Sequence, residues 1–203
     1  MTRSDYHDYV IKDGRFIGEF ELMYRDCEDP WRQDQLRHPA EELVLAAVRN
    51  HPPRRVLDIG CGRGAFTGRM WKELGAGISA IDIAPTAIRI AASRFPGVRF
   101  SVMDARDLHF APDSFDLTIA SELLWYVLPR LSDVFAEIRR VTTTEGRIIF
   151  IQHFYQTGEQ RYGTDVMQTV SDLLGFLPFA VEQMVEFDRL RNHKVVLFCK
   201  NAK

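Results

Sequence analysis

The stretch VLDIGCGRG, Val56 to Gly64, decides the fold of this 203-residue chain. An apolar run carrying Asp58 leads into three glycines in five residues, the pattern of a tight turn between a buried strand and a helix. Such turns let the backbone approach a ligand closely, and the usual ligand is a dinucleotide bound through G-x-G-x-x-G. Here the spacing is one residue shorter, and Asp58 would face like-charge repulsion from a pyrophosphate. The stretch therefore favours a ligand that presents a cation, over the alternative of a turn without any ligand.

Short β-branched runs alternate with amphipathic segments from Arg54 onward, which is typical of βαβ units and a parallel sheet. The strands are apolar without period-2 alternation, so we expect helices on both faces of the sheet. The predicted strands are 54–59, 77–83, 98–104, 115–121 and 146–154, and the predicted helices are 65–74, 85–95 and 131–141.

The two ends of the chain follow different patterns. Residues 163–177 predict a helix, and 179–188 and 193–201 predict an antiparallel pair that closes one edge of the sheet. Near the start, 15–31 and 39–51 predict two helices that precede the sheet and cover its ligand end. We expect one domain overall, with an N-terminal helical segment or lid at 1–53 and a core at 54–203.

Composition narrows the classes of partner. The formal charge of −2 provides no excess of cations for a phosphate backbone, which argues against nucleic acid. No signal-peptide pattern and no run of about 20 apolar residues is visible, so we expect a cytoplasmic protein without membrane contact. The three cysteines, Cys27, Cys61 and Cys199, never form C-x-x-C, which predicts free thiols and no metal site.

Carboxylates end three successive predicted strands. S-adenosyl-L-methionine carries an ammonium and a sulfonium and no phosphate, so it fits the charge of Asp58. Asp82 follows at the distance from which an acidic residue accepts both ribose hydroxyls. Asp104 is placed to accept the adenine amino hydrogens, with Met103 and Ala105 framing the ring. An aspartate at a strand end also commonly caps a helix, but three in succession favour the ligand.

With these motifs the sequence from Arg54 to Lys203 resembles the class I S-adenosyl-L-methionine-dependent methyltransferases. VLDIGCGRG matches their first motif, AIDI the acidic second, MDARDL the third, and SFDLTIASELLWYV the segment after the fourth strand. The resemblance implies an α/β, Rossmann-like, seven-stranded mixed sheet, mostly parallel with a C-terminal antiparallel hairpin and flanked by helices. It also implies S-adenosyl-L-methionine as cofactor and S-adenosyl-L-homocysteine as product.

Two further segments, CEDPWR and SELLWY, resemble the NodS-type N-methyltransferases, which methylate an amino sugar of a chito-oligosaccharide. In that group the N-terminal segment closes over the cofactor, which implies a cofactor-side role for Trp31 and Arg32. The full predicted cofactor-binding set is Trp31, Arg32, Asp58, Gly60, Cys61, Gly62, Gly64, Asp82, Ile83, Met103, Asp104, Ala105 and Ser121.

The methyl acceptor is predicted to lie at the loops after the fourth and fifth core strands. Glu122 is a candidate to bind an acceptor amine or take a proton, and contact with the cofactor or a helix N-terminus is its alternative role. His153 is a candidate base, with a structural role as its alternative. The predicted substrate-binding residues are aromatic and equally suited to the core of a lid: Trp125, Tyr126, Tyr155 and Tyr162.

The hypothesis from the sequence is thus a methyltransferase that acts on an amine or hydroxyl of a small molecule, with sugars and saccharides among the candidates. No Asn/Asp-Pro-Pro-aromatic run follows FDLTIA, which argues against DNA and protein-glutamine acceptors. The alternatives are a nicotinamide-dependent oxidoreductase, disfavoured by Asp58 and the glycine spacing, and a non-catalytic module that binds the cofactor and a partner. Monomer and homodimer both remain open.

Overall fold

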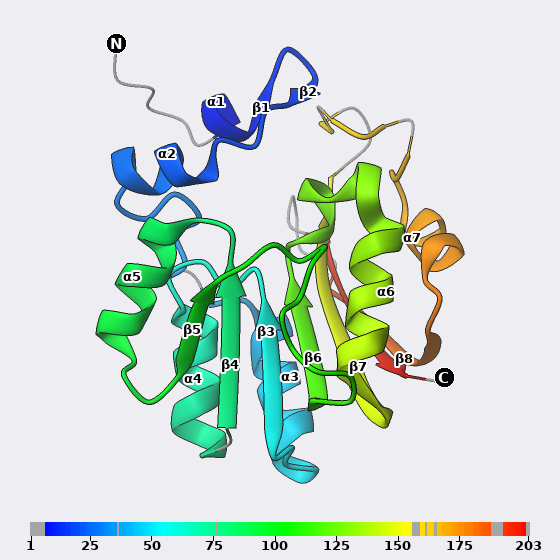
Figure 1. The fold of residues 1–203 in the computed structure, drawn as a ribbon. Coiled ribbons are helices and arrows are strands. Elements are labelled where there is room, and N and C mark those ends of the chain that lie inside the picture. Colours follow the sequence, from blue (N-terminus) through cyan, green and yellow to red (C-terminus); the bar gives the residue numbers. More distant parts are fainter. Residues whose placement is uncertain are drawn as a thin grey trace.

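A computed structural model describes residues 7–35, 37–75, 77–155, 159–160, 162–164, 166–187 and 193–201. Seven of the strands form one sheet in the order β5-β4-β3-β6-β7-β9-β8. Their bounds are β3 Arg55–Ile59, β4 Gly77–Asp82, β5 Arg99–Val102, β6 Phe115–Ser121, β7 Thr142–Phe154, β8 Ala180–Phe187 and β9 His193–Lys200. The strands β5, β4, β3, β6 and β7 are parallel, so their carboxyl ends share one edge, where the arrowheads point in Figure 1.

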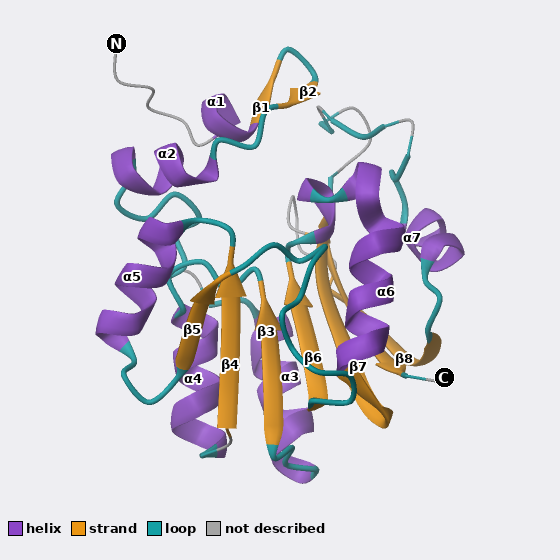
Figure 2. Cartoon of the chain, in the orientation of Figure 1, coloured by secondary structure: helices purple, strands orange, loops and turns teal. Residues whose placement is uncertain are grey.

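Helices cover both faces of this sheet (Figure 2). On one face lie α3 Pro39–Asn50, α4 Ala65–Leu74 and α5 Pro85–Arg94, whose Val44, Met70 and Ile88 join a buried cluster with Val56 and Ile78. On the other face lies α6 Leu131–Val141, which packs through its apolar stripe of Leu131, Val134, Phe135, Ile138 and Val141. Continuous apolar strands are explained by this double cover.

The C-terminal strands end the sheet as predicted. β9 pairs antiparallel with β7, and β8 pairs antiparallel with β9 and forms the edge. The predicted fold class, a mostly parallel seven-stranded sheet with an antiparallel C-terminal hairpin, is confirmed. Because β9 runs against its neighbour, its first residues lie at the same edge as the carboxyl end of β7, and His153 is the register partner of Lys194.

The N-terminal segment differs from the prediction. Instead of a helix over 15–31, it contains α1 His7–Val10, a two-stranded hairpin of β1 Ile11–Lys12 and β2 Arg15–Phe16, and a short α2 Phe20–Asp26. Asp13 and Gly14 form the two-residue turn with φ values of 50° and 70°, as a type I′ hairpin turn requires. These elements lie over the carboxyl ends of the parallel strands, with α2 above α5 (Figure 1). The helix predicted at 39–51 is present as α3, but it packs on one face of the sheet and not over its ligand end.

Two other boundaries were predicted wrongly. The helix expected at 163–177 begins only at Val170 as α7 Val170–Phe176, because Thr169 and Asp172 form a capping box that fixes the first turn. The strand expected to open at Gly146 begins earlier, at Thr142, since Thr142 already pairs with Phe115 before a bulge in the ladder.

Candidate functional site

The glycine turn between β3 and α4 forms the floor of the candidate site. Gly60, Gly62 and Gly64 have φ values of 77°, 54° and 76°, which residues other than glycine rarely adopt. The backbone N–H groups of Gly60 and Cys61 both donate to the Ile81 carbonyl, at 2.8 and 2.9 Å. The turn is thereby fixed to the end of the neighbouring strand β4.

Asp58 lies buried directly below this turn, with 2% of its surface exposed. Its carboxylate accepts a hydrogen bond of 2.5 Å from the Thr67 hydroxyl on α4. The pKa of Asp58 is raised to about 6, chiefly by burial; the Thr67 hydrogen bond opposes the rise, and the nearby Asp82 and Glu41 carboxylates add to it. A cation arriving beside Asp58 would relieve this cost of charge.

Asp82, at the end of β4, ties the glycine turn to the next helix. One carboxylate oxygen accepts from the Gly62 N–H and the other from the Ala84 N–H, both at 2.9 Å. Burial raises the pKa of Asp82, and these backbone hydrogen bonds oppose the rise. Beside it, Ile83 leaves 51% of its surface exposed, which is unusual for a large apolar residue at a strand end. A carboxylate beside an exposed apolar side chain suits a ribose and an aromatic base.

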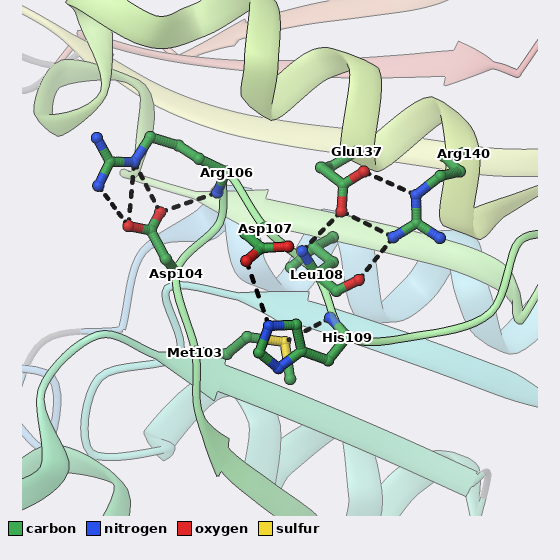
Figure 3. Close-up of polar contacts among 8 residues, drawn as sticks. All are labelled: Met103, Asp104, Arg106, Asp107, Leu108, His109, Glu137 and Arg140. Carbon is green, nitrogen blue, oxygen red and sulfur yellow. Dashed lines mark hydrogen bonds and ion pairs between the residues drawn. The ribbon is translucent and has the colours of Figure 1, made fainter.

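The carboxylate that follows β5 already forms hydrogen bonds within the chain. Asp104 accepts hydrogen bonds from the backbone N–H, Nε and Nη2 of Arg106, at 2.5 to 3.0 Å (Figure 3). The Arg106 guanidinium holds the pKa of Asp104 below its ordinary value. Met103 is half-buried and Ala105 is buried. An adenine amino group would have to share the Asp104 carboxylate with Arg106.

Helix α6 clamps the loop that follows β5. Glu137 accepts a hydrogen bond of 2.6 Å from the Leu108 N–H, and Arg140 donates to the Leu108 carbonyl at 2.6 Å (Figure 3). Arg140 also donates to the Phe110 carbonyl at 2.6 Å. Glu137 and Arg140 also pair with each other at 2.7 Å. The loop carrying Asp104 is therefore attached to the opposite face of the sheet.

Residues of the N-terminal segment lie against the glycine turn. A β-carbon placed on Gly62 would lie 2.8 Å from the Tyr24 hydroxyl and 2.8 Å from the Gln33 side-chain oxygen. The same Gln33 oxygen accepts a hydrogen bond of 3.2 Å from the Arg63 N–H, and the Trp31 indole N–H donates to the Tyr24 hydroxyl at 2.9 Å. Burial, followed by the charge of Asp82, raises the pKa of Tyr24. Trp31 reaches the turn through Tyr24, whereas Arg32 is exposed.

Polar contacts attach this N-terminal segment to the core at two further points. On α2, Glu21 accepts hydrogen bonds from the backbone N–H and the hydroxyl of Thr86, both at 2.8 Å, at the first turn of α5. Arg63, within the glycine turn, forms ion pairs with Asp29 at 3.6 Å and Asp34 at 3.2 Å. The Glu21 carboxylate at the N-terminus of α5 and the Arg63 cation between two carboxylates both favour attachment of the N-terminal segment to the core.

The loop after β6 supplies the opposite side of the site. Glu122 has φ +55° and lies between half-buried Ser121 and Leu123, whose side chain would lie 3.2 Å from a β-carbon on Gly60. The Glu122 carboxylate accepts a hydrogen bond of 3.0 Å from the His153 N–H and forms a 2.6 Å ion pair with Lys194. The structure thus brings Glu122 and the backbone of His153 together beside the glycine turn.

The predicted aromatic residues divide into two groups. Trp125 is 5% exposed, donates its indole N–H to the His153 carbonyl at 2.8 Å, and contacts Tyr155, which also contacts the His153 ring. Tyr126 packs instead on residues of the N-terminal segment, with ring centroids 5.3 to 6.4 Å from those of Phe16, Phe20 and Trp31. Tyr162 also contacts Phe16, at 5.8 Å. These contacts cover the edge of the sheet between α5 and β7.

An open cavity of about 670 Å³ lies beside β7 and α7, and of the predicted site residues it includes Tyr155. Arg161, which precedes the predicted substrate-binding residue Tyr162, lies outside the described residues. Among the residues that the structure describes, no group of three or more His, Cys, Asp or Glu side chains is arranged to hold a metal, and no helix is long and apolar enough to cross a membrane.

Comparison with known proteins identifies the domain that carries this site. Residues 57–150, from the strand before the glycine turn to the middle of β7, match the family model described as "Methyltransferase domain". This match confirms the predicted resemblance to the class I S-adenosyl-L-methionine-dependent methyltransferases. The family's cofactor is S-adenosyl-L-methionine.

Curated relatives of the chain carry different names. It is 30% identical to a malonyl-[acyl-carrier protein] O-methyltransferase of Serratia marcescens over 57% of this chain and 44% of the relative. It is 28% identical to nodulation protein S of Sinorhizobium fredii over 55% of this chain and 54% of the relative. The chain thus spans about half the length of the curated relatives it matches.

A solved structure shares the fold over nearly the whole of this chain. It is N-methyltransferase NodS of Bradyrhizobium japonicum, in complex with S-adenosyl-L-homocysteine. The match has a TM-score of 0.75 at 20% identity and covers 91% of this chain and 96% of that one. The predicted similarity to NodS-type proteins is confirmed by this structure and by nodulation protein S.

Three residues at the site were not predicted from the sequence of the chain: Tyr24, Gln33 and Lys194. Tyr24 and Gln33 lie in a segment predicted as one helix and its exit, where nothing in the spacing indicates contact with a turn 30 residues away. Lys194 carried a signal, because it begins the strand predicted to pair antiparallel at the sheet edge, which returns its side chain to the ligand end.

Proposed function

We propose that this chain binds S-adenosyl-L-methionine at the glycine turn and transfers its methyl group to an amine or hydroxyl of a small molecule, with saccharides in the candidate class. The observation that carries the proposal is the pair of carboxylates, the buried Asp58 and the half-buried Asp82, around three glycines of positive φ. This arrangement suits the ammonium and ribose of the cofactor and disfavours a pyrophosphate, and with it the nicotinamide alternative.

Methyl transfer from a sulfonium is an in-line displacement, so the protein chiefly aligns donor and acceptor and excludes water. The contacts of Tyr24 and Gln33 with the glycine turn support a covering role for the part of the N-terminal segment that precedes α3. We therefore assign this segment as a lid over the methionine end of the cofactor, with Trp31 acting through its hydrogen bond to Tyr24.

On the acceptor side, the proposed residues are Glu122 and His153. Glu122 is fixed beside the glycine turn by the His153 backbone and Lys194, which suits a carboxylate that binds and orients an acceptor amine or hydroxyl. The His153 imidazole lies against Tyr155, in position to take a proton on the same rim. The relatives' names include both O- and N-methyltransferases, so the proposal keeps both kinds of acceptor atom.

The test is transfer of a labelled methyl group from S-adenosyl-L-methionine into a fractionated cell extract, with the recipient identified by mass. We expect label in a small-molecule or saccharide fraction, lost with Asp82→Ala. Asp116→Asn is the matched control, because Asp116 begins β6 at the opposite edge and pairs with Arg55. Protein that binds S-adenosyl-L-homocysteine but labels no fraction would contradict transfer and favour the binding module.

A further inference from the structure

Lys194 reaches the candidate site from an unexpected element. It is the second residue of β9, the strand that runs antiparallel to β7, and it pairs in register with His153 at the carboxyl end of β7. Its side chain is only 17% exposed, and its Nζ lies 2.6 Å from Oε1 of Glu122. The C-terminal hairpin therefore places a largely buried cation at the edge where the parallel strands end.

The partner of Lys194 is held in a fixed position. Glu122 adopts φ +55°, a left-handed conformation that residues with a side chain rarely adopt. Its backbone N–H donates to the Ile151 carbonyl at 2.7 Å, and its other carboxylate oxygen accepts from the His153 N–H at 3.0 Å. The carboxylate is thus constrained at both oxygens, next to the residue that contacts Gly60.

A second carboxylate lies near Lys194 but has a cation of its own. Glu41, on α3, is paired with Arg69 at 2.6 Å. Burial raises the pKa of Glu41, and the charges of Arg69 and then Lys194 oppose that rise. Arg69 therefore compensates the charge of Glu41 more than Lys194 does. Glu122 has Lys194 as the cation within ion-pair distance among the described residues. The pairing of Lys194 with Glu122 is therefore specific.

We propose that Lys194 is a positioning residue that holds the Glu122 carboxylate at the methyl-transfer end of the site and neutralises its charge there. The inference rests on the proposed function, since it takes the glycine turn as the place of the donor. An unpaired carboxylate beside the sulfonium would bind the cationic donor more tightly than the neutral product, stabilising the ground state without aiding transfer. With Lys194 in place, Glu122 orients the acceptor while the local charge remains balanced.

Two cofactor analogues measure this charge without knowledge of the acceptor. Sinefungin carries an amine where the donor has its methyl sulfonium, and S-adenosyl-L-homocysteine carries no charge at that position. The ratio of their affinities, measured by calorimetric titration, therefore reports the local charge. We expect Lys194→Met to shift the ratio towards sinefungin by about tenfold, and Glu122→Gln to shift it the other way.

Control variants separate charge from structure. Lys194→Arg should keep the wild-type ratio, and Glu41→Gln should leave it unchanged because Arg69 compensates Glu41. The double variant Glu122→Gln/Lys194→Met carries neither charge, so its ratio should return to the wild-type value, because the two single shifts have opposite sign. Lys194→Gln gives the same test if the methionine variant does not fold.

Each outcome decides between the two proposals. Wild-type protein that binds neither analogue overturns the proposed function. Wild-type protein that binds both, with a ratio unchanged in Lys194→Met and Lys194→Gln, overturns the role of Lys194 and leaves the proposed function standing. A double variant whose ratio stays as far from wild type as that of Lys194→Met would also overturn it, because the charges of Lys194 and Glu122 would then not balance at this position.

Discussion

Asp58 is a residue whose chemistry opposes the stability of the protein without its ligand. Its pKa is about 6 in the folded protein against an ordinary value of 3.8, so the folded state holds the proton more tightly than the unfolded state. The free energy of unfolding therefore falls as pH rises from about 4 to 6, and the cost above pH 6 is on the order of 3 kcal/mol. Such a buried anion is expected where a cationic ligand supplies the missing charge.

This cost can be measured directly. Asp58→Asn should raise the free energy of unfolding of the ligand-free protein at pH 7.5, by up to about 3 kcal/mol, and give no gain at pH 4. Urea denaturation of both proteins at the two pH values is the measurement. An equal difference at both pH values would show that packing, rather than the charge of Asp58, accounts for the effect.

Asp82 combines a structural and a proposed ligand role. It accepts hydrogen bonds from the N–H groups of Gly62 and Ala84, so Asp82→Ala leaves donors of the turn unpaired and also removes the proposed ribose acceptor. We expect S-adenosyl-L-homocysteine to bind more weakly by on the order of 1–3 kcal/mol, measured by calorimetry. Undiminished affinity would remove Asp82 from the ribose role.

Among the elements, the glycine turn provides the clearest comparison. Gly62 and Gly75 have nearly the same φ, 54° and 58°, but a β-carbon would collide with Tyr24 and Gln33 at Gly62 and meet nothing within 4 Å at Gly75. Both alanine variants should lose on the order of 1 kcal/mol of stability. Only Gly62→Ala should also weaken binding of S-adenosyl-L-homocysteine, because it displaces the lid. Equal affinities of the two variants would contradict direct contact between lid and turn.

The elements also show how far the sequence determines the fold. From Arg55 to Phe154 each predicted strand and helix is present, because alternation of buried strands with amphipathic helices is a strong local signal. The N-terminal segment was predicted wrongly because apolar residues at helical spacing outweighed a stronger signal, the Asp13-Gly14 turn between Ile11 and Phe16. The start of α7 was missed likewise, although Thr169 and Asp172 have capping-box spacing.

At the candidate site, the sequence predicted the residues that end strands, and it missed those brought there by distant elements. The turn glycines, Asp58 and Asp82 lie together as the parallel topology requires. Tyr24, Gln33 and Lys194 arrive from the lid and the antiparallel hairpin, where side-chain direction depends on tertiary packing. Pairing of Asp104 with Arg106 was also not predicted, although the two are only two residues apart.

For the whole molecule, the sheet, the N-terminal cover and the C-terminal hairpin meet at one edge. There α2 lies over α5 (Figure 1), and Lys194 of the hairpin pairs with Glu122. The central claim is that this edge binds S-adenosyl-L-methionine. Calorimetric titration of the wild-type chain with S-adenosyl-L-homocysteine, and separately with NAD, tests it most directly. We predict saturable binding of one S-adenosyl-L-homocysteine per chain and no heat with NAD, whereas binding of NAD without S-adenosyl-L-homocysteine would contradict the account.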